Sequence, residues 1–252
     1  MTDYLDSLSE WWPMLARGVI ITLVVTVLTM LFGTILGLLV ATIRVACAQT
    51  SHLAARVADR ILKAYIDLMR GLPLIVTLFI FFFALPGAGI TISQDPLVVG
   101  VLAFTLTIAA YLAEVFRAAI LSVDNGQLEA ALSLGMNPVM AYRKIVLPQA
   151  MVVAVPTLGG YFISTLKDSS LLGFISVMDL MRTGIMLVST TFKAFEVYMT
   201  IGVIYLVLSL VAAKAISRIE YRSSTQGRSL RHLTPLDMPV VVPRFSQERR
   251  RR

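Results

Sequence analysis

The sequence predicts an all-α integral membrane protein with about five transmembrane helices. Hydrophobic residues make up 57% of the 252-residue chain and charged residues only 15%. Together with a mean hydropathy of +0.81, this composition lies outside the range of ordinary soluble globular proteins. A helix needs about 20 apolar residues to cross roughly 30 Å of hydrocarbon, and five stretches approach or exceed that length without a charged side chain.

The expected spans follow one another near residues 18–43, 72–93, 96–117, 150–172 and 197–216. The first is long enough to cross with tilt, and the second is long enough even with a Pro86-Gly87 turn inside it. The other three have charge-free cores at the lower length limit. Each continues past one charge into further apolar residues, because a snorkelling or interior-facing charge is tolerated there.

Short segments flank this transmembrane domain, which runs over 18–217. Residues 1–17 precede it and are expected to be periplasmic; their acidic character and the length of the first apolar run argue against a cleaved signal peptide. Residues 218–252 follow it as a basic cytoplasmic tail. The tail is expected to be disordered, since Pro235, Pro239 and Pro243 lie within it.

The distribution of cations predicts how the chain is oriented in an inner membrane. With five spans, the termini lie on opposite faces, and Lys and Arg in short loops stay on the cytoplasmic side. Placing the C-terminus inside leaves only Arg17, Arg182 and Lys193 outside and Lys167 within a span, out of 22 Lys and Arg in total. The net charge of +7 is then explained by topology and by attraction to anionic membrane lipid, not by nucleic-acid binding.

The sequence contains no pattern for catalysis or for a cofactor. Cys47 is the only cysteine, which excludes an intramolecular disulfide and a Cys-rich metal site. His52 and His232 are far apart and are expected to be solvated loop residues. No hydrolase triad, phosphate-binding glycine loop or metal-ligand cluster is found. The chain is therefore not expected to be an enzyme, and any ATP used is hydrolysed by another chain.

Residues 123–148 form a loop that is too polar to cross the membrane and too patterned to be a simple connector. Asp124 or Asn125 can cap a first short helix, and Gly135 offers the left-handed conformation that ends one. Asn137 can cap a second helix, with a proline in its first turn.

Two functions remain open for this loop. Pro148 marks where the chain is expected to change direction toward the membrane. A short helix with small exposed side chains can enter a groove on a partner closely, and such side chains are found at Ala130, Ala131 and Leu132. A pair of interfacial helices lying on the inner leaflet is the alternative.

Motifs in and around the loop resemble those of a known family. Glu129-Ala130-Ala131, Gly135 and the IVLP run at 145–148 resemble the EAA signature of the membrane subunits of bacterial ABC importers. The neighbouring motifs are similar to those of the polar amino acid branch, the histidine, glutamine and arginine permeases. They are RGLPL at 70–74, YLAEVFR at 111–117, GQLEAA at 126–131 and LKDSSL at 166–171.

The resemblance extends from about residue 18 to residue 217 and implies the type I ABC importer transmembrane fold. It implies a second permease subunit, identical or different, two cytoplasmic ATPase subunits that bind ATP and Mg, a periplasmic amino-acid-binding protein and an amino acid substrate. It also implies that the loop docks in a cleft of the ATPase. The residues expected at that contact are Gln127, Glu129, Ala130, Ala131, Leu132, Gly135, Pro138, Leu147 and Pro148.

Charges at membrane depth are costly and normally face an interior or a polar pathway. Glu114 and Arg117 are three residues apart, so a helix brings them together as an ion pair, with either a structural or a gating role. Adjacent Lys167 and Asp168 diverge by about 100° on a helix and need other partners. The polar stripe around them either lines the substrate pathway or holds helices together; it comprises Ser164, Thr165, Lys167, Asp168, Ser169 and Ser170.

Two other classes of function compete with the importer. An ion-coupled secondary carrier usually shows internal repeats and broken helices at corresponding positions, and the two halves of this chain show no repeat. A noncatalytic membrane anchor would explain the loop but not the charges at 167 and 168.

Overall fold

A computed structural model describes the backbone of residues 2–231 and the side-chain surroundings of residues 8–221, and all regular structure in that part of the chain is helical. Four long helices form the bundle: α1 (Thr2–Ala48), α5 (Pro96–Leu121), α8 (Leu147–Asp168) and α10 (Ala194–Arg231). The shorter helices are α2 (Leu53–Gly71), α3 (Leu74–Phe79), α4 (Leu85–Gly87), α6 (Asn125–Ser133), α7 (Pro138–Ala141) and α9 (Leu180–Thr191). The predicted all-α fold class is confirmed.

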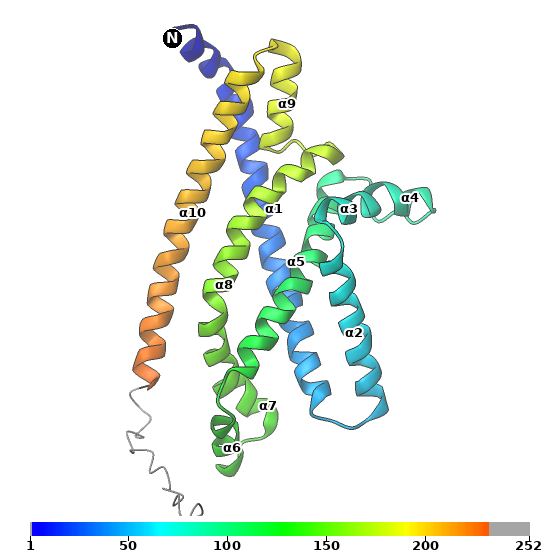
Figure 1. Cartoon of the computed structure of the whole chain (residues 1–252), viewed down its shortest axis with the longest axis vertical. Helices are drawn as coiled ribbons and strands as arrows, with labels where there is room; N and C mark the ends of the chain where they lie inside the picture. The colour runs from blue at the N-terminus through cyan, green and yellow to red at the C-terminus, as the bar shows by residue number, and fades with distance from the viewer. Residues whose placement is uncertain (1, 232–252) are drawn as a thin grey trace, which may run out of the picture.

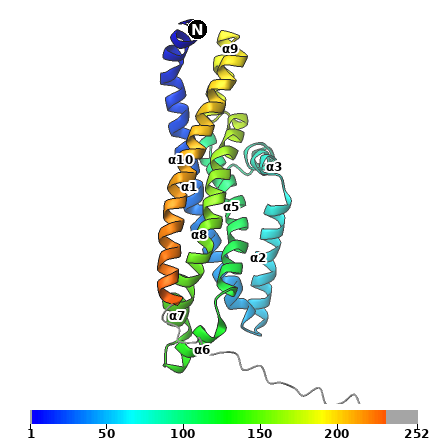
Figure 2. The same ribbon diagram turned by 60° about the vertical axis from the view of Figure 1, so that its left-hand side comes forward.

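Shorter helical turns connect some of these elements. Residues Ile80–Ala84 and Tyr142–Val146 are π-helical, and Ser169–Ile175 form a 3-10 helix directly after α8. Both figures show α6 and α7 at one end of the bundle, with the N-terminus and α9 at the other (Figure 1, Figure 2).

The membrane-spanning helices agree in number with the prediction but differ in one place. Four helices in the described residues are long and apolar enough to cross, and the bent pair α2 and α3–α4 makes up to a fifth. The arms of this pair meet at 107°, because Leu72 before Pro73 is extended (ψ 138°), as a residue preceding proline prefers. The bend comes before the predicted span at 72–93, whose helical part runs only from Leu74 to Gly87, so this stretch does not form a full span without α2.

Helix α2 was not predicted, because its six charged residues exclude it from any search for apolar runs. It is amphipathic instead. Its inner face packs Ile66, only 1% exposed, against Val40 of α1 and Ala110 and Ala113 of α5. The Tyr65 hydroxyl donates to the carbonyl of Leu106 at 2.6 Å, which fixes α2 along the flank of α5.

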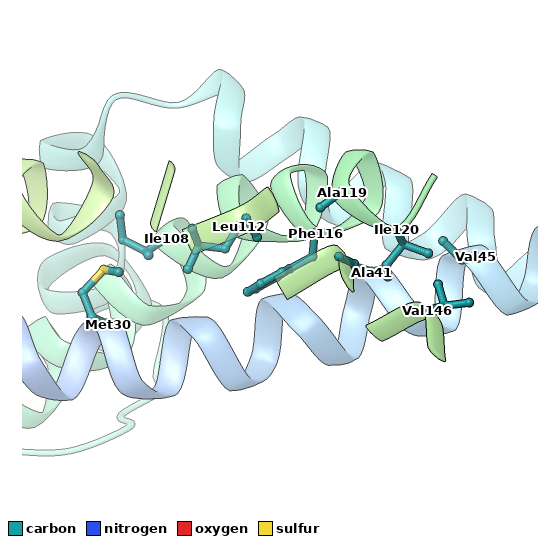
Figure 3. Close-up of a cluster of buried hydrophobic side chains, with 11 residues drawn as sticks. Met30, Ala41, Val45, Ile108, Leu112, Phe116, Ala119, Ile120 and Val146 are labelled. Atoms are coloured by element: carbon teal, nitrogen blue, oxygen red, sulfur yellow. The ribbon is translucent and has the colours of Figure 1, made fainter. Parts of the chain in front are cut away.

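The most extensive packing in the bundle is between α1 and α5. A Cβ added at Gly37 would lie 2.9 Å from the Cβ of Leu112 and 3.0 Å from the carbonyl oxygen of Ala109, so only glycine permits this approach of the helices. Figure 3 shows side chains of both helices meeting in one buried cluster, which Val146 and Ala150 complete from the side of α8.

The opposite end of the bundle is held by a buried carboxylate. Asp179 is 0% exposed and caps α9 by accepting from the backbone N–H of Arg182 at 2.9 Å. The backbone N–H of Leu180 donates to the Thr22 hydroxyl at 3.2 Å, and Tyr205 donates to Asp179 at 3.5 Å. Helices α1, α9 and α10 are joined by these bonds.

The span predicted at 150–172 lies within the helical stretch that α8 and the following 3-10 helix form up to Ile175. The predicted tail differs in part from the structure. Helix α10 continues to Arg231, so residues 218–231 are helical and not disordered, while residues 232–252 of the predicted tail lie outside the described residues.

Candidate coupling surface and translocation pathway

The turn between α6 and α7 is built by local hydrogen bonds. The Asp124 carboxylate accepts from the backbone N–H of Gly126 at 2.7 Å and so caps α6. Gly135 has φ +79° and its N–H donates to Leu132 O at 3.0 Å, while the N–H of Met136 reaches Ala131 O at 3.2 Å. These two bonds form a Schellman motif, which requires the left-handed conformation that glycine adopts without strain.

The second half of the turn begins at Asn137, whose side chain accepts from the backbone N–H of Met140 at 2.8 Å. Pro138 occupies the first turn of α7, and a π-helical turn joins α7 to α8. Pro148 lies in the first turn of α8. The expected change of direction at Pro148 is wrong, because a first-turn proline needs no intrahelical N–H bond and does not interrupt the helix.

The predicted contact residues of the loop do not all face outward. Six of the nine predicted residues are exposed: Glu129, Ala130, Leu132, Gly135, Pro138 and Pro148. Two are half-buried, Gln127 and Leu147. Ala131 is only 4% exposed, so the expectation that it is presented to a partner is wrong: it lies on the side of α6 that faces its own chain.

Four large apolar side chains are exposed beside the Gly135 turn, and three of them, all but Leu132, were not among the predicted contact residues. Leu134 is 83% exposed and Val139 is 77% exposed, and Leu132 and Met140 are exposed beside them. We call these four residues the tip patch. They flank the Gly135 turn, so apolar residues beside a helix-ending glycine were the signal for them. An exposed apolar patch at the end of a polar loop is typical of a protein-binding surface.

The turn is also tied to α1. The Gln49 side-chain amide, at the end of α1, donates to the hydroxyl of Tyr142. A cavity of about 360 Å³ lies beside this bond and includes Val45, Ile120 and Val139 in its lining. The turn therefore contacts the end of α1, and Ile120 near the end of α5 lines the same cavity as Val139.

An ion-pair network lies at the same end of the bundle. Glu114 accepts from Arg117 at 2.8 Å and from Arg44 at 2.5 Å, and Arg44 also donates to Asp59 at 2.9 Å. The predicted partners Glu114 and Arg117 are thus together in the structure. Arg44 and Asp59 extend the pair across α1, α2 and α5. No local pattern could indicate these two partners, since Arg44 and Glu114 are 70 residues apart.

The predicted polar stripe on α8 divides between two faces. Thr165 and Ser169 are buried; Thr165 donates to the sulfur of Met30 at 3.6 Å, and Ser169 donates to the Leu166 carbonyl at 2.7 Å. Ser164 and Lys167 are exposed, whereas Asp168 and Ser170 are half-buried. Thr165 therefore packs against α1, Ser169 bonds within its own helical segment, and the other four members are at least partly exposed in this chain.

The exposed face of α8 is unusually polar for a membrane helix. It presents residues spaced three or four apart: Val153, Pro156, Thr157, Gly160, Ser164 and Lys167. The exposed face of α10 carries only large apolar side chains over Val203, Leu206, Val207, Leu210 and Val211. The exposed face of α10 is therefore suited to contact with lipid. The exposed face of α8 is suited to contact with water or with another protein.

The depth of this polar face follows from the contact with α1. Met30 lies at the middle of the apolar run 18–43, and Thr165 touches its sulfur. Asp168 follows one helical turn later, about 5 Å further along the axis. Centring the apolar run 18–43 in the bilayer would put the Asp168 carboxyl group and Lys167 near the middle of the hydrocarbon layer. Neither forms a salt bridge with another described residue.

Comparison with known proteins gives consistent matches. Residues 33–223 match the family model described as "Binding-protein-dependent transport system inner membrane component". The L-cystine transport system permease protein TcyL of Bacillus subtilis (strain 168) is 36% identical over 82% of this chain and 86% of its own length. The glutamine transport system permease protein GlnP of Escherichia coli (strain K12) is 32% identical over 83% and 93%.

A solved structure titled "Crystal structure of an amino acid ABC transporter with histidines" has a similar chain. The TM-score is 0.76 at 35% sequence identity, and the alignment covers 86% of this chain and 97% of that one.

The ion-pair network leads to a test of stability. Glu114→Gln should lower the stability of the detergent-purified protein by about 1–3 kcal/mol, because two partly buried guanidinium groups lose one carboxylate. Arg117→Gln should cost less, since Arg44 still pairs with Glu114. Thermal unfolding of both variants measures the difference, with Glu129→Gln on the exposed loop as the control. Equal losses in the Glu114 and Arg117 variants, or a Glu114 loss no larger than the control, would contradict a shared network.

Proposed function

Because the chain belongs to the family of binding-protein-dependent transport system inner membrane components, we propose that it is the permease subunit through which an ATP-binding cassette importer carries a polar amino acid. The family places the chain in the inner membrane as a multi-pass protein. The permease is not itself an enzyme, because a separate partner subunit hydrolyses ATP. Relatives named for cystine and glutamine transport support an amino acid as the substrate.

The complete importer would contain two permease subunits, two ATPase subunits that bind ATP and Mg, and a periplasmic amino-acid-binding protein. The exposed polar face of α8 supports the second permease. Thr157, Ser164 and Lys167 lie at depths where lipid would leave their polar atoms unsatisfied. Facing a second subunit across a hydrated pathway satisfies them.

The tip patch is the proposed contact with the ATPase. Contact with a cytoplasmic ATPase would require α6 and α7 to lie in the cytoplasm and the N-terminus in the periplasm. The position of the N-terminus and of α6 and α7 at opposite ends of the bundle supports this orientation (Figure 1). Leu134 and Val139 would fill an apolar cleft. Closure of the ATPases on ATP would then push the turn, and the Gln49–Tyr142 bond would pass the movement to α1, opening the pathway to alternate sides.

Asp168 is the proposed contact for the ammonium group of the amino acid. Its support is its depth near mid-membrane, its partial exposure and the absence of a salt-bridge partner among the described residues. Lys167 or a helix N-terminus of the partner permease would receive the substrate carboxylate.

A charge placed in the tip patch tests the coupling contact. Leu134→Glu and Val139→Glu should each weaken retention of the ATPase by about tenfold or more, because the cleft would have to desolvate a carboxylate without a partner. Copurification from the membrane measures this retention. Ile90→Glu is the matched control, since Ile90 is also an exposed apolar loop residue but lies away from the tip patch.

Chain insertion should be normal in all three variants. Full ATPase retention in both tip-patch variants would remove this turn as the docking element.

A neutral side chain at Asp168 tests the pathway. Asp168→Asn should abolish most receptor-dependent uptake in reconstituted vesicles while the complex keeps its subunits and its basal ATP hydrolysis. Thr165→Val is the matched control: it changes a neighbour that faces the core, so it should affect heat stability more than uptake. Full uptake by Asp168→Asn, or equal loss of uptake in the two variants, would exclude a substrate contact at Asp168.

A further inference from the structure

The corner where α1 ends and α2 begins holds an open pocket of about 500 Å³. Its lining combines the connecting turn Cys47–Ser51 with residues from the first turns of α2, Arg56, Asp59 and Arg60. The corner lies at the same end of the bundle as α6, on its flank (Figure 1). None of the functions described above uses this pocket.

The charges around the pocket favour an anion. Arg56 and Arg60 are four residues apart, so they project from the same face of α2. Within the described part of the chain, neither guanidinium has a carboxylate within salt-bridge distance. The carboxylate of Asp59 is occupied, since Arg44 donates to it at 2.9 Å. The pocket therefore offers two unpaired guanidinium groups, and the hydroxyl groups of Thr50 and Ser51 beside them.

Guanidinium groups bind the oxygens of phosphate in a geometry that matches their planar fork. Two of them on successive turns can hold one phosphate from adjacent sides. The pocket therefore has the chemistry of a phosphate site.

The outer surface of α2 shows where such a phosphate would come from. Exposed apolar side chains run along the helix next to the arginine face, at Leu53 (76% exposed), Val57 (44%), Ile61 (63%) and Leu68 (56%). Helix α2 lies on the flank of the bundle in both views (Figure 2), so this apolar stripe is not covered by the chain. Because α2 runs alongside the bundle (Figure 1), this stripe faces the acyl chains while the arginines of its first turns lie toward the headgroups.

We propose that the α1–α2 corner binds the phosphate of an anionic phospholipid. Arg56 and Arg60 hold the phosphate in the pocket, and the apolar stripe of α2 lies against the acyl chains. A free phosphate ion shares the headgroup chemistry but would gain nothing from the stripe. Through Asp59 and Arg44, the occupied site is continuous with the network at Glu114, so a bound lipid holds α2 against α1 and α5. This inference does not depend on which substrate is transported.

Lipid retention by the complete purified complex tests the site. Native mass spectrometry is used to compare the retention of phosphatidylglycerol with that of phosphatidylcholine carrying the same acyl chains. The wild type should prefer phosphatidylglycerol. Arg56→Gln with Arg60→Gln should reduce that preference about tenfold or more, since each cation near an anionic lipid contributes roughly a factor of five. Lysines at both positions should retain part of it.

Lys63→Gln is the matched control, because Lys63 is an exposed cation of the same helix that does not line the pocket. It should keep the wild-type preference. An unchanged preference in the double glutamine variant, or an equal loss in the Lys63 variant, would overturn the site. Displacement of the lipid by millimolar inorganic phosphate would overturn the assignment to a lipid.

Discussion

The close packing of α1 against α5 is the constraint on which the rest of the structure depends. At Gly37 the backbones approach so closely that a methyl group would contact both the Cβ of Leu112 and the carbonyl oxygen of Ala109. In a bilayer, such packing replaces the hydrophobic effect as the source of helix association. About two turns further along α1, Arg44 lies beside Glu114, and Arg44 also donates to Asp59 of α2. Gln49, at the end of α1, then donates to Tyr142, so the packing also positions the turn between α6 and α7.

The membrane explains why α8 carries the proposed pathway and α10 does not. Inside hydrocarbon each polar group needs a partner within the protein or a hydrated cavity. The buried half of the polar stripe satisfies this requirement within the chain, as Thr165 and Ser169 show. Ser164 and Lys167, on the exposed half of the stripe, are not buried against other parts of the chain. The same reasoning separates the importer from a membrane anchor, since an anchor would not need a polar face at mid-depth.

Much of the fold could be predicted because membrane spans and helix caps depend on short stretches of sequence. The apolar runs identified the long helices, and the capping positions Asp124, Gly135 and Asn137 are used in the structure as their residue types suggested. Helix α2 was missed because amphipathic helices have no apolar run. The partnership of Arg44 with Glu114 and the inward side of Ala131 depend on tertiary packing, which no local pattern encodes. The sequence left open whether the stripe around Thr165 lines a pathway or holds helices together for the same reason, since spacing alone does not show which face of α8 is buried.

The energy source for transport tests the central claim most directly. The complex would be reconstituted into vesicles with its ATPase and its binding protein, and uptake of a radiolabelled polar amino acid would be measured with ATP supplied on one side. The account predicts uptake only when ATP is present on the side that the tip patch faces and the binding protein is on the opposite side. Uptake driven by an ion gradient without ATP would contradict it and identify a secondary carrier.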